Sequence, residues 1–195
     1  MHYHLAQINI GRMLAPLINP IMAGFGEQLN VINALADNSP GFVWRLQTLE
    51  GDATALRPYE DELILVNMSV WASLADFSAF AYASNGQHHR VMQQRRQWFE
   101  RFDGPYTALW WVPAGHIPSV EEAKERLDYL RTHGESPYAF SFKTVAAIAT
   151  SSKRPTKEFP ASSRKPVERA ESESDPVGVD EAFERERERI AKIRA

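Results

Sequence analysis

The stretch ELILVNMSVWASLADFSAFAY, residues 62–82, predicts a β-strand that turns sharply into a helix. Side chains alternate between the two faces of a strand, so one face of residues 63–71 is wholly apolar. The other face carries Leu63, Leu65, Asn67, Ser69 and Trp71, with an amide and a hydroxyl in mid-strand. Uncharged polar groups between large apolar residues are typical of the wall of a partly enclosed cavity. One wet face of an ordinary antiparallel sheet explains the pattern equally well.

Other segments have the same kinds of periodicity. Residues 3–10, 42–49 and 106–112 alternate as strands, and residues 138–143 alternate weakly as a short edge strand. Apolar residues spaced by three and four predict helices from about residue 21, after Ser73, after residue 88 and from Ser119. Ser119 and Glu122 form a capping-box pattern, and Gly134 is placed to end the last helix.

The order strand, helix, strand, strand, helix, strand is that of an α+β protein with a ferredoxin-like split βαβ arrangement, if the extra helices are set aside. Such a fold has one antiparallel sheet with helices on one face. We therefore expect the helices to cover the apolar face. The face of Asn67 and Ser69 is then left for a second protomer, which would pack sheet to sheet.

Composition narrows the class of protein. The 195 residues are 44% hydrophobic, carry a net charge of −3 and include no cysteine, which excludes disulfides and thiolate metal sites. No clustered basic surface indicates nucleic-acid binding, and no apolar run approaches the ~20 residues of a membrane span. We expect a cytoplasmic protein with a folded domain over residues 1–148. Residues 149–195 are rich in Ser, Pro, Lys, Arg and Glu and predict a disordered tail, in which a charged helix near the end is an alternative.

Several long motifs resemble one sequence family. They are PGFVWRLQ (40–47), LVNMSVWASLADFSAFAY (65–82), RRQWFE (95–100), GPYTALWWVPAGHIPSVEEAKERLDYLRTHG (104–134) and AFSFK (139–143). In this order they resemble the family known as domain of unknown function 3291. The resemblance implies a dimeric α/β barrel, a superfamily that also holds antibiotic-biosynthesis monooxygenases, chlorite dismutases and aldoxime dehydratases. It implies a homodimer but no particular reaction.

Candidate ligand-binding residues come mainly from the strands. Arg45 is the only charge in its strand and suits a carboxylate or phenolate oxygen, although an ion pair is the alternative. Asn67 and Ser69 suit substrate orientation, or else simple cross-strand hydrogen bonds. Gln7 and Asn9 form a similar polar pair on the first strand. Trp71, Trp110 and Trp111 are candidates for the apolar lining, and the adjacent Trp110 and Trp111 must face opposite ways.

The candidate catalytic residue is His88, near the start of a basic helix. A helix N-terminus disfavours the imidazolium form, which suits a general base or an axial haem ligand; a solvent-facing helix cap is the alternative. The leading hypothesis is a protein that binds a small apolar or aromatic molecule, with cofactor-independent monooxygenase-like chemistry and no metal or cofactor. Haem binding and a non-catalytic binding or interaction role are the alternatives.

Overall fold

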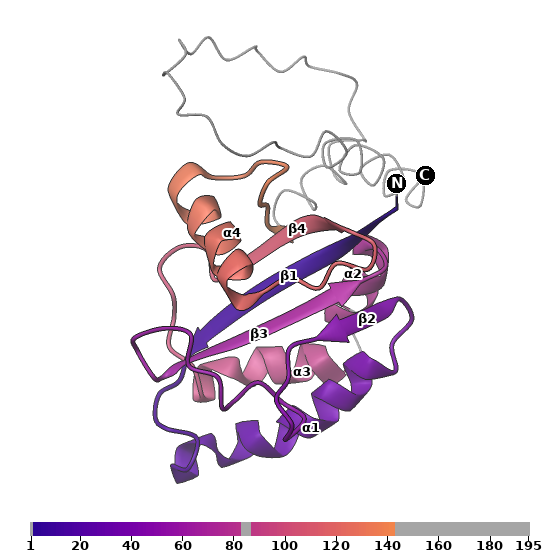
Figure 1. Cartoon of the computed structure of the whole chain (residues 1–195). Helices are drawn as coiled ribbons and strands as arrows, with labels where there is room; N and C mark the ends of the chain where they lie inside the picture. Colours follow the sequence, from indigo (N-terminus) through magenta and orange to yellow (C-terminus); the bar gives the residue numbers. More distant parts are fainter. Residues whose placement is uncertain (1, 83–86, 143–195) are drawn as a thin grey trace, which may run out of the picture.

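One antiparallel sheet of four strands organises the computed structural model, which describes residues 2–82 and 87–142 (Figure 1). The strands are β1 (Tyr3–Arg12), β2 (Phe42–Arg45), β3 (Ile64–Trp71) and β4 (Thr107–Pro113). They lie in the order β2-β3-β1-β4, and each neighbouring pair is antiparallel. The first and third strands are central, as in the ferredoxin-like split βαβ fold. The α+β class expected from the sequence is confirmed.

Among the described residues, six helical segments accompany the sheet, and α4 begins and ends at the expected capping residues. They are η1 (Pro20–Met22), α1 (Ala23–Asp37), α2 (Leu74–Tyr82), α3 (Gln87–Gln94), η2 (Arg95–Gln97) and α4 (Val120–His133), of which η1 and η2 are single 3₁₀ turns. Ser119 Oγ accepts a hydrogen bond from the Glu122 N–H at the start of α4. Gly134, at φ 82°, adopts the left-handed conformation that ends this helix.

Helices cover both faces of the sheet, so the expectation that they cover only one face is wrong. α4 packs through Ala123, Leu127 and Leu130 on the apolar face, which includes Met68 and Trp110. α1, α2 and α3 lie on the opposite face, with α4 across the sheet from them (Figure 1). We call this second face, which carries Asn67 and Ser69, the polar face. Because α4 brings its own apolar stripe, the apolar face is buried within a single chain.

β2 is shorter than residues 42–49 and contains a bulge. Phe42 pairs with Trp71 but Trp44 pairs with Val70, so Val43 is an extra residue in the ladder. The bulge places Phe42 and Arg45 on the same face, although simple alternation placed them on opposite faces.

Two segments outside the strands pack against the sheet. Tyr59, in the connection from β2 to β3, packs against the apolar face, and Lys124 Nζ of α4 donates to the Pro58 carbonyl at 2.6 Å. Of the edge strand expected at residues 138–143, the described part forms one isolated bridge, between Leu109 and Phe140. Among the residues that the structure describes, no helix is long and apolar enough to cross a membrane.

Candidate functional site

The strand register sorts the polar face into rows that run across the sheet. The paired residues form the rows Phe42–Trp71–Leu5–Trp111, Arg45–Ser69–Gln7–Leu109 and Asn67–Asn9–Thr107, after which come Leu65 and Gly11. Polar residues therefore occupy two adjacent rows in the middle of the face. We call Gln7, Asn9, Asn67, Ser69 and Thr107 the polar band.

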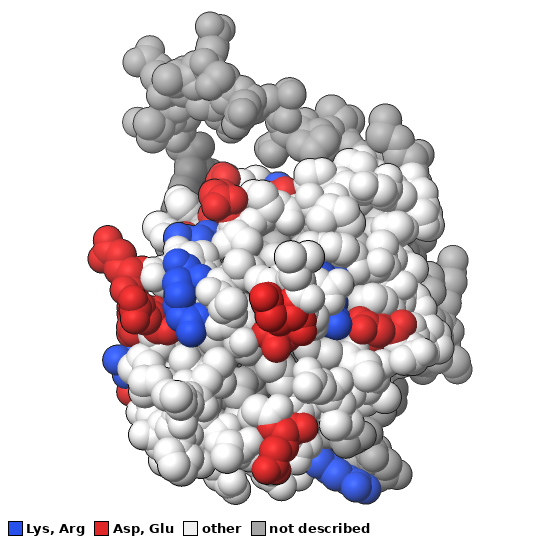
Figure 2. Space-filling view, turned by 60° about the horizontal axis from the view of Figure 1, so that its bottom comes forward, with Lys and Arg blue, Asp and Glu red and all other residues white. Residues whose placement is uncertain are grey.

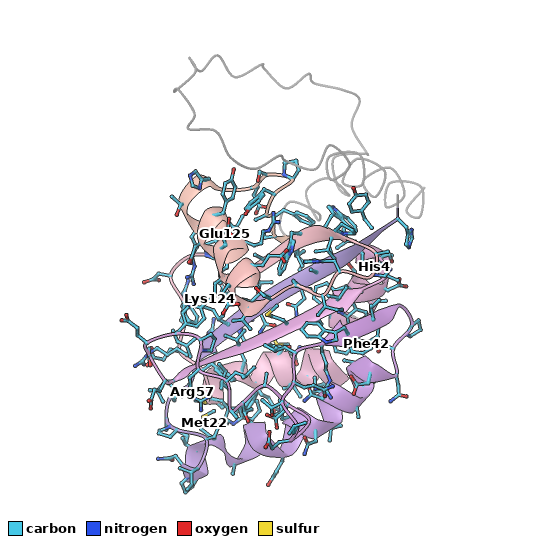
Figure 3. All side chains as sticks on the ribbon, in the orientation of Figure 1. His4, Met22, Phe42, Arg57, Lys124 and Glu125 are labelled. Atoms are coloured by element: carbon cyan, nitrogen blue, oxygen red, sulfur yellow. The ribbon has the colours of Figure 1, made fainter. Side chains whose placement is uncertain are left out.

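An apolar cluster lies at each end of the polar band. One contains Leu5, Trp71 and Trp111 of the sheet with Phe77 of α2, and the other contains Met13, Met22, Leu65 and Trp98. Phe42 and Met22, which belong to the two clusters, lie at opposite ends of the sheet (Figure 3).

Helix α1 connects the two clusters across the polar band. Phe25 near its start packs in one cluster, and Ala36 near its end packs in the other. Residues 25, 29, 32 and 36 share one face of a helix, so half-buried Leu29 and Ile32 lie on the same face of α1 as Phe25 and Ala36. The polar band thus has an apolar cluster with aromatic residues at each end, and α1 contributes one residue to each cluster.

The row Asn67–Asn9–Thr107 keeps its hydrogen-bonding groups free. Asn67 is exposed and Asn9 and Thr107 are half-buried, although all three belong to the sheet beneath the helices. None of the three side chains forms a hydrogen bond with any residue that the structure describes. Asn67 has β1 on one side, and on its other side the ladder with β2 has already ended at the pair Arg45–Ser69, so Asn67 lies on a stretch of β3 that is unpaired on that side. Two amides and one hydroxyl are therefore available there to a ligand.

The next row is closed by hydrogen bonds of its own. Gln7 Nε2 and Trp71 Nε1 each donate to Ser69 Oγ, both at 2.9 Å, and all three side chains are buried. The cross-strand hydrogen bond, given above as the alternative for Ser69, is present. For Asn67, in contrast, no such bond forms within the described residues.

Arg45 lies beside Ser69 but is occupied by an ion pair. Its Nε and Nη2 donate to the Asp37 carboxylate at 2.7 and 3.1 Å, and its Nη1 donates to the Gly51 carbonyl at 2.7 Å. Only 12% of the Arg45 side chain is exposed. The planar fork of the guanidinium is thus used within the chain, at the end of α1.

The two adjacent tryptophans of β4 face opposite ways, as alternation requires. Trp110 lies on the apolar face, where its Nε1 donates to Glu122 at 2.9 Å, and so is apart from the polar band. Trp111 lies on the polar face in the cluster with Phe140, and its buried Nε1–H has no hydrogen-bond partner among the described residues.

Thr107 was missed from the sequence, and one expected residue is not described. Thr107 carries no local signal, because only the register of β4 against β1 places it beside Asn9. His88 lies in α3, but its side chain is outside the described residues. Its roles as a base or a haem ligand stay predictions. Within residues 2–82 and 87–142, no group of three or more His, Cys, Asp or Glu residues could hold a metal ion.

These features define an α+β protein with a ferredoxin-like sheet and a polar band beneath its helices. The chain belongs to the family of domain of unknown function 3291, which matches residues 4–157, as the motifs indicated. No curated protein matches the chain.

Two solved structures are similar to the chain. One is SnoaB, a cofactor-independent oxygenase from Streptomyces nogalater, at 16% identity and a TM-score of 0.38, over 58% of this chain and 95% of SnoaB. The other is a protein of unknown function from Nitrosomonas europaea, at 15% identity and a TM-score of 0.38, over 60% of this chain and 96% of that protein.

Proposed function

We propose that this protein binds a small, mainly apolar organic molecule with neutral oxygen groups, held between the polar band and helix α1. The observation that carries the proposal is the row Asn67–Asn9–Thr107, whose free amides and hydroxyl lie in the sheet and are accessible to solvent. Ligand sites in proteins are mostly apolar and contain a few polar groups that fix the orientation of the ligand. Two apolar clusters and three free neutral side chains match that composition.

The alternative to a ligand site is an ordinary sheet face whose polar groups are hydrated. Helices pack on this face at both ends of the polar band, and Asn9 is half-buried between the two clusters. Buried polar groups are usually bonded to one another, as Gln7, Ser69 and Trp71 are in the adjacent row. The absence of such bonds for Asn9 and Asn67 within the described residues favours a ligand site.

As the reaction at this site we propose cofactor-independent oxygenation of the bound molecule. An activated methylene group between aromatic rings can be oxidised to a carbonyl by O2, which is reduced to the new carbonyl oxygen and one water. All the electrons then come from the substrate. Neutral amides can hold the enol or phenol oxygen of such a substrate by hydrogen bonds, without a fixed charge nearby. Anthrone is a suitable probe: oxygen uptake with formation of anthraquinone, above the rate without protein, is the expected result.

Binding is tested by calorimetric titration with 1-tetralone, a bicyclic neutral ketone. We expect saturable binding that weakens roughly tenfold or more in Asn67→Leu, because one hydrogen-bonding group is lost and the band is partly filled. The matched control is Asn30→Leu, at an exposed position of α1, which should bind as the unmodified protein does. Equal affinities for Asn67→Leu and Asn30→Leu would contradict the proposal, as would no saturable binding at all.

A further inference from the structure

The Ser69 hydroxyl has one hydrogen and two lone pairs. Both lone pairs are engaged, because Gln7 Nε2 and Trp71 Nε1 donate to Oγ at 2.9 Å. The hydroxyl hydrogen is therefore left to donate, and none of the described residues accepts it. Ser69 is only 8% exposed, so this is a buried donor without an acceptor.

The surroundings of Ser69 limit where its hydrogen points. Gln7 approaches from β1 and Trp71 from the aromatic end of β3. On the β2 side lies Arg45, whose guanidinium is a cation with donors only and repels the hydrogen. The remaining direction along the polar face is toward Asn67, in the row Asn67–Asn9–Thr107.

A second buried donor lacks an acceptor on the same face. The Trp111 Nε1–H is buried, it has no partner within residues 2–82 and 87–142, and the residue is 5% exposed. Buried polar groups are nearly always hydrogen-bonded, so each exception calls for an explanation. Both groups lack an acceptor, and both lie on the polar face.

We propose that the polar face recognises its ligand through a neutral carbonyl oxygen, and that the Ser69 hydroxyl, oriented by Gln7 and Trp71, donates to it. The inference rests on the proposed function and narrows its ligand to a class, ketones or quinones. A carboxylate is disfavoured, because the charge of the nearby Arg45 is already compensated by Asp37 and a buried anion needs a free counter-charge. A hydrocarbon leaves the hydroxyl unpaired.

The test compares 1-tetralone with tetralin, which has the same rings without the oxygen, in Ser69→Thr and Ser69→Val. Thr and Val have nearly the same shape, and both suit a strand, but only Thr keeps a hydroxyl. We expect the unmodified protein and Ser69→Thr to bind 1-tetralone about tenfold more tightly than tetralin. Ser69→Val should bind the two molecules equally. 1-Naphthoate should bind more weakly than 1-tetralone to the unmodified protein.

The outcomes separate this inference from the proposed function. If Ser69→Val keeps the preference for 1-tetralone while Asn67→Leu lowers the affinity, a ligand site exists but Ser69 is not its donor. If 1-naphthoate binds most tightly, the inference that the ligand is a neutral ketone or quinone is wrong. If 1-tetralone does not bind the unmodified protein, both proposals fail. Circular dichroism shows whether each variant is folded. Should Ser69→Val not fold, Ser69→Ala serves instead: it removes the hydroxyl without adding bulk, so we expect it to bind 1-tetralone and tetralin equally, and a kept preference for 1-tetralone there would overturn the inference.

Discussion

Trp110 and Trp111 are adjacent residues of one strand with different hydrogen bonding. The Trp110 indole N–H donates to the Glu122 carboxylate, whereas the buried Trp111 N–H has no partner in the part of the chain that the structure describes. Replacing either tryptophan by phenylalanine removes similar apolar area. The difference between the two variants therefore measures the hydrogen bond itself.

We expect Trp110→Phe to lower the free energy of unfolding by about 1–3 kcal/mol more than Trp111→Phe does, because a bond to a charged acceptor is lost. Trp111→Phe removes an unpaired donor, and this gain partly offsets its lost packing. Urea denaturation of the two variants measures the difference. Equal losses would contradict the pairing assigned to Trp110.

His4 makes the stability of the fold depend on pH. Burial, and secondarily the nearby His2, lowers the pKa of His4 below its ordinary value of 6.5. Above pH 6.5 the imidazole is neutral in both the folded and the unfolded chain, and it has no effect. As the pH falls through 6.5 the unfolded chain binds the proton first, so stability decreases until the pH reaches the folded pKa.

We therefore expect a lower free energy of unfolding at pH 5.5 than at pH 7.5, and a smaller difference in His4→Gln. Asp61 and Glu121 do not interfere, because their pKa values are lowered from ordinary values of 3.8 and 4.5 and they titrate at lower pH. Urea denaturation at the two pH values measures both proteins. The same pH dependence in His4→Gln would refute the assignment.

At the level of secondary-structure elements, two glycines in and just after α1 differ in whether the fold leaves room for a side chain. Gly41, in the turn before β2, has φ +74°, and a Cβ there would lie 2.3 Å from Asp76 Cγ at the start of α2. Gly26, inside α1, has nothing within 4 Å of the position a Cβ would take. Gly41 therefore allows the turn and the approach of α2, whereas Gly26 only adds conformational freedom to the unfolded chain.

We expect Gly26→Ala to raise the free energy of unfolding by about 0.5–1 kcal/mol, and Gly41→Ala to lower it by more than about 1 kcal/mol. The two substitutions add the same methyl group, so each is a control for the other. Thermal melts compare them. A stabilising Gly41→Ala would show that this turn is not held as described.

The alternation of residues 63–71 was enough to predict β3 and the division of its two faces. It did not show which face each helix covers, because that depends on where the connections from β1 to β2 and from β4 to α4 run. The position of Arg45 was missed for a local reason, the extra Val43 in β2, and its partner Asp37 comes from the preceding helix. The row Asn67–Asn9–Thr107 could not be predicted, because it depends on the register of three strands and the sequence of one strand does not give that register.

On the scale of the whole molecule, both faces of the sheet are covered within one chain, by α4 on one side and α1–α3 on the other. A homodimer formed by direct contact of two sheets would require α1–α3 to move if it used the face of Asn67 and Ser69, and α4 to move if it used the other face. The expected homodimer stays a prediction. On the face seen in Figure 2, Lys and Arg are interspersed with Asp and Glu, and most of the surface is uncharged.

The expected boundary at residue 148 and the tail at residues 149–195 lie outside the described residues, and the family match ends at residue 157. From the polar composition beyond that point, we expect a chain that ends at residue 157 to melt within a few degrees of the full chain and to keep its number of subunits. Thermal melts and light scattering measure these two properties. A larger loss of melting temperature would show that residues 158–195 pack on the domain.

The central claim is that the free amides of Asn9 and Asn67 meet a ligand beneath α1. Their side-chain amide signals in a nitrogen-15 correlation spectrum report on this directly, once Asn9→Asp and Asn67→Asp identify them. On titration with 1-tetralone we predict that these two signals shift together and saturate, while the signal of exposed Asn30 does not move. Saturable binding that leaves the Asn9 and Asn67 signals unchanged would contradict the claim.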